Sequence, residues 1–355
     1  MGDVISIIVT GAGAPGIAGT IYSLRNNPDN IKFKIISTDI KENSVGKYLS
    51  DEFYVIPPPE DTSYTNVIKR IAKENDSKVI LPQTTREIVK LSMHRKEFEN
   101  DGINIIVSNY EKLIVANDKF LLLEKAREFD IPYPKYYLIN SQNSFMEAIE
   151  EIGYPEKRVV VKPRVSNGMR GLRIITSKKW DVERFLTEKP EEVEIDLNSF
   201  IYIFEKEKWP ELIVTEYMPG EEYTVDVFRD KGEIAVIPRL RKSIRSGITF
   251  EAQVELRKDL INFSKKLSEI LDLYYCFGFQ FKLSEEGVPK ILECNPRVQG
   301  TMVVSTFAGF NMIYYAVKKA MGFEINLDAL NLREVKFWRY WGGIAIEDEK
   351  FIEKI

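Results

Sequence analysis

The chain has 355 residues, which is too long for one ordinary domain and suits two or three packed modules. Apolar residues make up 44% of it and charged residues 29%, and the net charge of −4 gives no electrostatic reason to expect a nucleic-acid partner. The longest apolar stretches, such as residues 4–9, have the length of a strand and are too short for a membrane span.

The scarcity of histidine and cysteine limits the chemistry. His94 is the only histidine and lies among charged residues, so we expect neither a catalytic histidine nor a histidine-rich metal site. Cys276 and Cys294 lie in apolar segments without partners at metal-ligand spacing, and we interpret them as reduced, buried thiols of a cytoplasmic protein. Carboxylates, amides, lysine and arginine must therefore carry any reaction.

Strands and helices alternate over the first module. Apolar runs rich in β-branched residues predict buried strands at residues 4–9, 33–37, 79–81 and 103–107, with helices between them. Such alternation predicts a parallel sheet with right-handed crossovers.

A glycine-rich loop follows the first of these strands. Gly11, Gly13 and Gly16 have the spacing Gly-x-Gly-x-x-Gly before a helix, and Asp39 ends the next strand. This is the context of a dinucleotide fingerprint, so a nicotinamide oxidoreductase is one interpretation. The same amides can bind another small anion, or the glycines can serve a tight turn alone.

The pattern changes to α+β after a helix that begins near Asp118, which supplies N-cap chemistry. The sequence predicts strands at 159–161 and 172–176, a charged peripheral insert at 178–208, and a helix at 256–271. It also predicts three neighbouring antiparallel strands at 212–217, 222–228 and 233–238, a hairpin of strands 278–283 and 290–293, and aromatic residues 337–341 that pack back on the body.

The predicted hairpin contains side chains that are typical of a metal-binding site. Strand alternation places Gln280 on the face opposite Phe279 and Phe281, and it gives Glu293 and Asn295 a common face on the partner strand. Oxygen ligands of this kind suit Mg²⁺. Arg297 stands just beyond the strand, where a fixed guanidinium can hold a transferring phosphoryl group.

A second segment has the chemistry of a polyphosphate site. Lys162 ends a run of buried β-branched residues, where a charge is costly unless it meets an anion. Residues 164–171, here called the phosphate loop, follow at once and include Ser166, Gly168 and Gly171, which expose backbone amides. Lys119, in the first turn of its helix, can add another positive charge.

Residues 215–222, here called the hinge, are predicted to pass from a strand into a turn and back. Backbone groups near Glu216 and Met218 can read the edge of adenine, and Glu222 can bridge ribose hydroxyls. Taken alone, the same residues are also consistent with an ordinary acidic turn.

Together these segments resemble the ATP-grasp superfamily, especially its carbamoyl-phosphate-synthase-like and carboxylate–amine ligase branches. The resemblance runs from about Met1 to Gly322 and has four specific places: Lys119, Lys162, Glu216 to Glu222, and Gln280 with Glu293 to Arg297. It implies an α/β Rossmann-like N-terminal (pre-ATP-grasp) domain at 1–115 that does not use NAD. It further implies a two-part α+β ATP-grasp fold, with a small subdomain at 116–214 and a C-terminal subdomain with a tail at 215–355.

The resemblance also implies roles. Lys119 and Lys162 would contact the ATP phosphates under the phosphate loop, and the hinge would bind adenine and ribose. Gln280, Glu293 and Asn295 would bind one or two Mg²⁺ ions, with Mn²⁺ as a substitute, although many relatives have an acid where Gln280 stands. Arg297 would steady the acyl phosphate and would act in catalysis together with Lys162 and Arg241. Arg239 and Arg241 lie where such enzymes often have a phosphate- or substrate-binding arginine.

We therefore expect an ADP-forming ligase that phosphorylates a carboxylate and lets an amine, thiol or similar nucleophile displace the phosphate. Its partners would be small molecules, without nucleic acid or membrane, and a homodimer is left open. Two rival hypotheses remain: a non-catalytic nucleotide-binding protein of the same fold, and the nicotinamide oxidoreductase.

Overall fold

The computed structural model describes residues 4–166, 168–188, 193–328, 330–340, 342–347 and 350–354. The chain forms two compact units, each built from segments that are distant in sequence. Unit 1 contains Met1–Asn117, Glu222–Gln280 and Cys294–Ile355, and unit 2 contains Asp118–Glu221 and Phe281–Glu293. The division into domains at 1–115, 116–214 and 215–355 stays a prediction.

The N-terminal part of unit 1 contains the predicted parallel sheet. Its strand order is β3-β2-β1-β4-β5, and all four pairings are parallel. The strands are β1 (Ile5–Thr10), β2 (Phe33–Asp39), β3 (Glu52–Val55), β4 (Val79–Leu81) and β5 (Asn104–Ile105). The prediction named four of them and missed β3, whose residues are only half-buried at the edge of the sheet.

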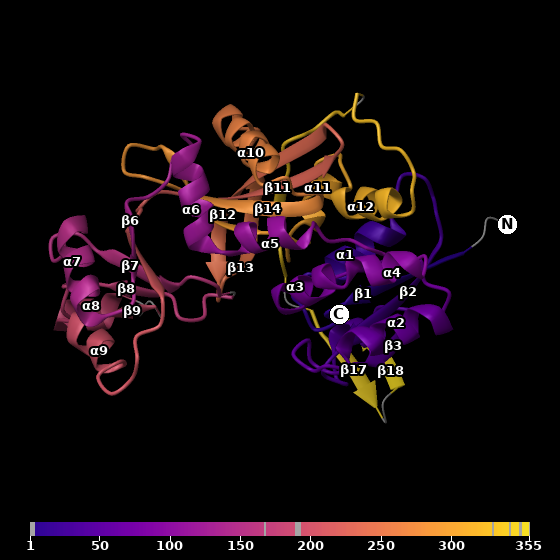
Figure 1. Ribbon diagram of the computed structural model, residues 1–355, viewed down its shortest axis with the longest axis horizontal. Helices are drawn as coiled ribbons and strands as arrows, with labels where there is room; N and C mark the ends of the chain where they lie inside the picture. The colour runs from indigo at the N-terminus through magenta and orange to yellow at the C-terminus, as the bar shows by residue number, and fades with distance from the viewer. Residues whose placement is uncertain are drawn as a thin grey trace. The chain divides into compact units, whose positions relative to one another are not determined.

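Helices cover both faces of this sheet (Figure 1). They are α1 (Ile17–Arg25), α2 (Tyr64–Glu74), α3 (Thr85–Met93), α4 (Arg95–Asn100) and α5 (Tyr110–Asn117), with a short 3₁₀ helix at Val45–Tyr48. Ile7 and Val9 share a core with α1, whereas Ile8, between them, shares a core with α2 to α5. The alternation of β1 thus explains why this strand is apolar on both faces.

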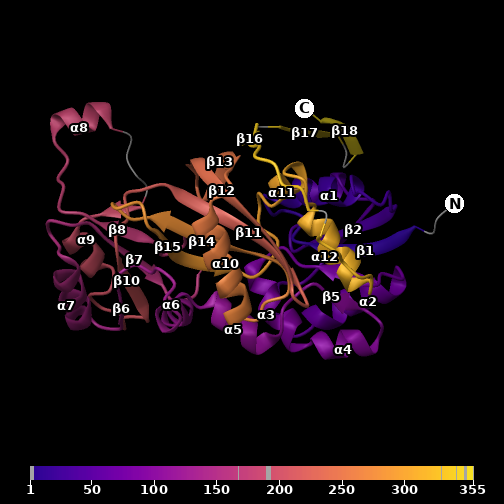
Figure 2. The same cartoon turned by 90° about the horizontal axis from the view of Figure 1, so that it is seen from above.

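A six-stranded sheet has the order β15-β14-β11-β12-β13-β16. Its strands are β11 (Glu222–Asp230), β12 (Glu233–Arg245), β13 (Ile248–Val254), β14 (Tyr275–Leu283), β15 (Pro289–Asn295) and β16 (Lys336–Trp338). Three helices accompany them: α10 (Lys258–Ile270), α11 (Val303–Phe307) and α12 (Met312–Ala320). α10 packs against β11 and β12 (Figure 2). Phe228 and Cys276 of this sheet belong to the same core cluster as Ile7 and α1, so unit 1 has a core that both sheets share.

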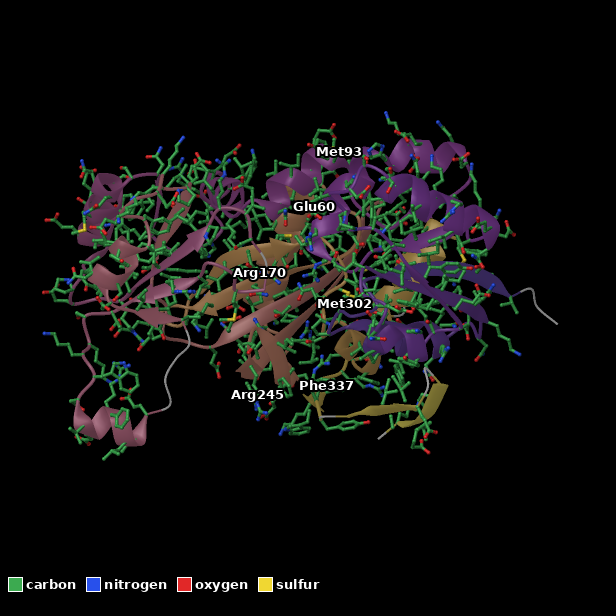
Figure 3. The ribbon with its side chains drawn as sticks, turned by 90° about the horizontal axis from the view of Figure 1, so that it is seen from below. Glu60, Met93, Arg170, Arg245, Met302 and Phe337 are labelled. Atoms are coloured by element: carbon green, nitrogen blue, oxygen red, sulfur yellow. The ribbon has the colours of Figure 1, made fainter. Side chains whose placement is uncertain are left out.

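The prediction that aromatic residues 337–341 pack back on the body holds for Phe337 but is wrong for Trp338 and Tyr340, which are 61% and 81% exposed. Phe337 lies in β16, which pairs with β13, and its ring stacks on Phe307 at 6.4 Å (Figure 3). Trp341, which belonged to the same prediction, lies outside the described residues. Beyond it, β17 (Ile344–Glu347) and β18 (Lys350–Lys354) form a separate two-stranded sheet.

Unit 2 is built on a five-stranded sheet of order β6-β10-β7-β8-β9. Its strands are β6 (Tyr136–Ile139), β7 (Val159–Pro163), β8 (Arg173–Ile175), β9 (Glu194–Ile195) and β10 (Leu212–Glu216), and its helices are α6 (Lys119–Glu128), α7 (Gln142–Ile152), α8 (Val182–Thr187) and α9 (Leu197–Tyr202). Phe145 of α7 and Phe200 of α9 contact Trp209, which fixes two helices to this core.

One strand prediction is wrong. We expected residues 212–217, 222–228 and 233–238 to be three neighbouring strands, but β10 pairs with β6 and β7, whereas β11 and β12 pair with each other in the other sheet. β10 is an interior strand between two partners, which explains why Leu212 to Thr215 are all buried. Within the described residues, no helix is both long and apolar enough to cross a membrane.

Candidate functional site

The predicted metal ligands lie on β14 and β15. Phe279 and Phe281 are fully buried while Gln280 between them is partly exposed, as the predicted alternation requires. Glu293 and Asn295 are also partly exposed, and Cys294 between them is buried. The described residues contain no group of three or more His, Cys, Asp and Glu side chains that could hold a metal. A divalent ion here would therefore depend on one carboxylate and two amide oxygens.

Lys119 joins two predicted functional segments of unit 2. Asp118 caps α6 by accepting hydrogen bonds from the amides of Phe120 and Leu121, and this cap fixes the first turn on which Lys119 lies. Lys119 is only 5% exposed, and its Nζ donates to the carbonyl oxygen of Ser166 at 2.9 Å. The same Nζ lies 3.6 Å from Glu293 Oε2. One buried ammonium group thus contacts both the phosphate loop and the predicted metal carboxylate.

Lys162 lies in β7, opposite Ile213 of β10, and is 6% exposed. Its Nζ donates to the carbonyl oxygen of Leu292 at 3.3 Å, next to Glu293 in the chain. Burial of an ammonium group is costly unless it lies among polar or anionic groups. Such a position is suited to an anionic ligand.

Two glycines determine the shape of the phosphate loop. Gly168 and Gly171 have φ of +60° and +75°, which L side chains rarely adopt. A Cβ atom on Gly171 would also lie 2.5 Å from Pro163 Cγ, so the loop can turn back against β7 only with glycine there. Arg170, between them, is exposed (Figure 3). Asn167, also part of the predicted loop, lies outside the described residues.

The hinge begins where β10 ends. Glu216 Oε1 accepts hydrogen bonds from Lys290 Nζ at 2.6 Å and from the amide of Lys135 at 2.9 Å. Its carboxylate is therefore engaged inside unit 2, and its backbone amide donates to the carbonyl oxygen of Lys135 at 3.1 Å. Met218 is buried, and the amide of Gly220 donates to the carbonyl oxygen of Leu283 at 3.1 Å.

Arg241 contacts the predicted ribose-binding carboxylate directly. Its Nη1 donates to Glu222 Oε1, its Nε to Thr249 Oγ1 at 2.8 Å, and its Nη2 to the carbonyl oxygen of Gly247 at 2.7 Å. The sequence prediction ended this strand at Pro238, but β12 continues to Arg245, so Arg241 lies within the strand. The missing amide of a single proline was not enough to end it. A catalytic role for Arg241 stays a prediction.

Arg297 is held in place just after β15. Its Nε donates to Thr85 Oγ1 at 3.0 Å, its Nη1 to the carbonyl oxygen of Val298 at 2.8 Å, and its Nη2 lies 3.4 Å from Asn295 Oδ1. Thr85 is the first residue of α3. A guanidinium fixed at several points has little conformational entropy left to lose when it meets an anion.

The N-terminal glycine loop is organised by contacts inside unit 1. The amide of Gly13 donates to Asp39 Oδ2 at 2.7 Å, and the amide of Lys41 donates to Asp39 Oδ1 at 2.9 Å. A Cβ atom on Gly16 would lie 2.8 Å from the Cα of Gly300. Both Asp39 oxygens bind protein amides, and Gly16 serves close backbone packing, so the tight-turn interpretation is favoured over the dinucleotide one.

Sequence reasoning missed a buried network beside this loop. Glu87 accepts hydrogen bonds from Thr10 Oγ1 at 2.7 Å, from the amide of Thr84 at 2.8 Å and from Tyr64 Oη at 2.7 Å. Burial, with the Glu87 carboxylate beside it, raises the pKa of Tyr64 well above its usual range. The signal was present as the capping box that Thr84 and Glu87 form at the start of α3.

Comparisons with known proteins agree with this architecture. A family model described as "ATP-grasp in the biosynthetic pathway with Ter operon" matches residues 208–335, and one described as "PylC-like, N-terminal domain" matches residues 7–106. The matched regions give the chain a PylC-like N-terminal domain followed by an ATP-grasp domain. The predicted fold class is thereby confirmed.

Curated relatives are larger proteins. The chain is 26% identical over 323 residues to the carbamoyl phosphate synthase large chain of Clostridium acetobutylicum, a match that covers 86% of this chain and 27% of the relative. The corresponding protein of Clostridium botulinum is 25% identical over 315 residues, with 85% and 26% covered. The chain therefore spans about a quarter of the length of the curated relatives it matches.

Solved structures share the fold at lower identity. N5-carboxyaminoimidazole ribonucleotide synthetase in complex with ADP has a TM-score of 0.67 and 16% identity, over 92% of this chain and 80% of that one. The biotin carboxylase of Campylobacter jejuni, in a complex with a β,γ-ATP ligand, has a TM-score of 0.68 and 16% identity, over 93% and 74%. At this identity the likeness establishes the fold alone.

Proposed function

We propose that the protein is an ATP- and Mg²⁺-dependent ligase that phosphorylates a carboxylate to an acyl phosphate, which an amine or a similar nucleophile then attacks with release of ADP and phosphate. The observation that carries this proposal is the position of Lys119, whose Nζ contacts Ser166 of the phosphate loop and lies 3.6 Å from Glu293. Lys119 therefore lies next to both the predicted phosphate-binding loop and a predicted metal ligand.

For the nucleotide, different predicted residues would bind the phosphates, the adenine and the ribose. Lys119, Lys162 and the amides of the phosphate loop would hold the phosphates, since they combine buried positive charge with exposed N–H groups. The backbone at Glu216 and Met218 would bind adenine, because the Glu216 carboxylate is already engaged by Lys290. Glu222 would bind the ribose from a position that Arg241 fixes.

For the metal, the donor set fits a hard cation that also binds phosphate. Glu293 provides a partly exposed carboxylate on β15, which is a hard oxygen ligand of the kind that Mg²⁺ takes. Gln280 and Asn295 would add neutral oxygens. Mg²⁺, when bound, would neutralise part of the charge on the phosphate oxygens.

Phosphoryl transfer itself would depend on Arg297, Lys162 and the phosphate loop. Arg297, fixed by Thr85 and Asn295, would stabilise negative charge on the transferring phosphoryl group. Lys162 would hold the outgoing diphosphate, and closure of the phosphate loop would exclude water from the acyl phosphate.

Hydroxylamine trapping tests this proposal. With Mg·ATP and a panel of carboxylates, the enzyme should form a hydroxamate from its own acid, with ADP accumulating in step. AMP and pyrophosphate appearing instead of ADP would contradict the acyl-phosphate mechanism.

One observation favours a second candidate, a non-catalytic nucleotide-binding protein. Only Glu293 of the three predicted metal ligands is a carboxylate, and the described residues contain no group of three or more His, Cys, Asp and Glu side chains that could hold a metal. Thermal unfolding with Mg·ATP, Mg·ADP and NADH separates the candidates, since a ligand stabilises only the protein that binds it. Stabilisation by Mg·ATP without ADP formation from any acid would favour the second candidate, and stabilisation by NADH alone would favour an oxidoreductase.

Three further proposals concern the metal ion, the cellular location and the oligomeric state. Mn²⁺ should replace Mg²⁺, because both prefer oxygen ligands. We also propose a cytoplasmic location, because Cys276 and Cys294 are buried and form no disulfide, and we leave a homodimer open.

A further inference from the structure

Part of the charged insert at residues 178–208 belongs to the sheet of unit 2, because its strand β9 pairs in parallel with β8. Arg184 of α8 is only 6% exposed, and it donates from Nη2 to Glu194 Oε2 at 2.6 Å and from Nε to Glu188 Oε2 at 2.7 Å. The side chain of Glu194, in β9, is 11% exposed. The insert therefore contains a nearly buried carboxylate that Arg184 holds from one side.

The other oxygen of Glu194 binds an arginine that also touches the hinge. Glu194 Oε1 accepts a hydrogen bond from Arg158 Nη1 at 3.3 Å. The Arg158 guanidinium carbon lies 3.7 Å from the centre of the Tyr217 ring, well within the range of a cation–π contact. Tyr217 is the hinge residue between Glu216 and Met218. One guanidinium thus connects the insert to the hinge.

The register of two strands explains why Arg158 meets Tyr217. β7 and β10 are antiparallel, with Val159 opposite Glu216. Extending this register by one residue places Arg158 opposite Tyr217. Residues directly opposite each other on antiparallel strands share a face and interact, so this contact follows from the pairing of β7 with β10.

The face of β7 that carries Arg158 is the open one. Val159 and Val161 belong to the core that α7 and α9 cover, whereas Val160 between them is partly exposed. Alternation therefore places Arg158, Val160 and Lys162 together on the face opposite that core. Lys162 is the predicted phosphate ligand, and Arg158 lies four residues, or about 13 Å, nearer the hinge end. An extended nucleotide spans a comparable distance between its terminal phosphate and its base.

Side chains hold the hinge on both sides of its backbone. The Glu216 carboxylate, on one side, binds Lys290. Tyr217, on the other side, follows the last residue of β10 and is held by Arg158. Backbone groups that are fixed before a ligand arrives lose less entropy when they bind it. A planar guanidinium that Glu194 already engages is a suitable anchor, since it too has little freedom left to lose.

We propose that Arg158 is a positioning residue for the adenine end of the nucleotide, acting through Tyr217, and that Glu194 of the insert holds Arg158 in that role. This inference rests on the proposed function, and it adds the insert to the parts of the chain that serve nucleotide binding. Arg158 would strengthen the binding of ligands that carry the base. It would contribute nothing to a polyphosphate that lacks one.

Isothermal titration calorimetry with two probes tests this role: Mg·ADP, and inorganic triphosphate with Mg²⁺, which has phosphates but no base. Arg158→Met should weaken ADP binding about fivefold, the loss expected for one cation–π contact, and leave the affinity for triphosphate unchanged. Arg158→Lys keeps the charge without the planar stack, so it should recover only part of the loss. Lys157→Met, which removes a charge from the exposed neighbouring position, is the matched control.

The part played by the insert has its own test. Glu194→Gln should weaken ADP binding less than Arg158→Met does. The double variant should bind ADP no more weakly than Arg158→Met alone, because Glu194 acts through Arg158. Glu183→Gln, at an exposed acid of α8, is the control. Additive losses in the double variant would overturn the role of Glu194.

The two probes also separate this inference from the proposed function. Equal ADP affinity in Arg158→Met and wild type, or an equal loss of affinity for ADP and triphosphate, would overturn the positioning role while the wild type still binds nucleotide. A wild-type protein that binds neither probe would count against the proposed function itself. Thermal unfolding of each unliganded variant confirms that the compared proteins are folded.

Discussion

Lys119 and Glu293 form an ion pair with 3.6 Å between Nζ and Oε2, in which the lysine is almost fully buried and the glutamate is partly exposed. The pair connects a phosphate-binding candidate to a metal-ligand candidate. Loss of either partner should therefore affect both ligands.

Glu293→Ala should lower ligase turnover by about 100-fold or more, because the site would lose its only carboxylate. Mg²⁺ dependence of the residual activity should shift to higher concentration. Steady-state rates across a Mg²⁺ titration provide the measurement, and Glu285→Ala, an exposed acid in the β14–β15 turn, is the control. Near-normal activity of Glu293→Ala at ordinary Mg²⁺ would show that the metal assignment is wrong.

Gly171→Ala should disturb the phosphate loop. The added Cβ would lie 2.5 Å from Pro163 Cγ at a φ of +75°, so we expect a loss of about 1–3 kcal/mol of unfolding free energy and weaker ATP binding. Urea unfolding and ATP titration measure the two effects. Gly102→Ala has nearly the same φ, +74°, with no atom within 4 Å of the added Cβ, so it isolates the conformational cost. Equal ATP affinity in Gly171→Ala and wild type would remove the loop from the nucleotide site.

Arg241→Lys should raise KM for ATP about fivefold or more while kcat changes little, because Arg241 positions Glu222 and is not expected to contact the reacting atoms. The effect should be much smaller with 2′-deoxy-ATP, which lacks one of the hydroxyls that Glu222 would bind. Lys242→Ala, at an exposed neighbouring position, is the control. A fall in kcat with unchanged KM would instead support the catalytic role first predicted for Arg241.

Asp29 should contribute to stability in a pH-dependent way. Hydrogen bonds from Lys318 and then Tyr314 lower the pKa of its carboxyl group. A carboxyl with a lower pKa in the folded state stabilises the protein above its unfolded pKa, near 4, and loses that contribution as pH falls through the folded value. Asp29→Asn should therefore reduce stability at pH 7 and flatten its decline below pH 4. Urea unfolding across pH 2–7 would show it, and parallel curves for the two proteins would contradict it.

The sequence predicted those features that depend on local pattern. Asp118 predicted the start of α6, which places Lys119, and alternation around Gln280 predicted which side chains of β14 are buried. Lys162 was predicted as a charge at the end of a buried strand, and it is buried there. In each case the information lay within a few neighbouring residues.

Features that depend on distant segments could not be predicted in the same way. Nothing local distinguishes β10, which joins β6 and β7, from a neighbour of β11, because a strand's partner is chosen by packing of the whole sheet. Likewise, Arg158 and Tyr217 are distant in sequence, and only the fold reveals that their side chains are in contact. The pairing of Arg241 with Glu222 depends on the register of β11 and β12.

The contact between Gly16 and Gly300 has a consequence for engineering and for evolution. Any side chain at position 16 would meet the backbone of the turn that follows Arg297, because a Cβ there would lie 2.8 Å from the Cα of Gly300. Arg339 binds the carbonyl oxygens of Pro15 and Gly300, so it joins the same two turns from a third segment. A chimera that takes its N-terminal domain from one relative and the rest from another should fold well only when both turns come from the same parent.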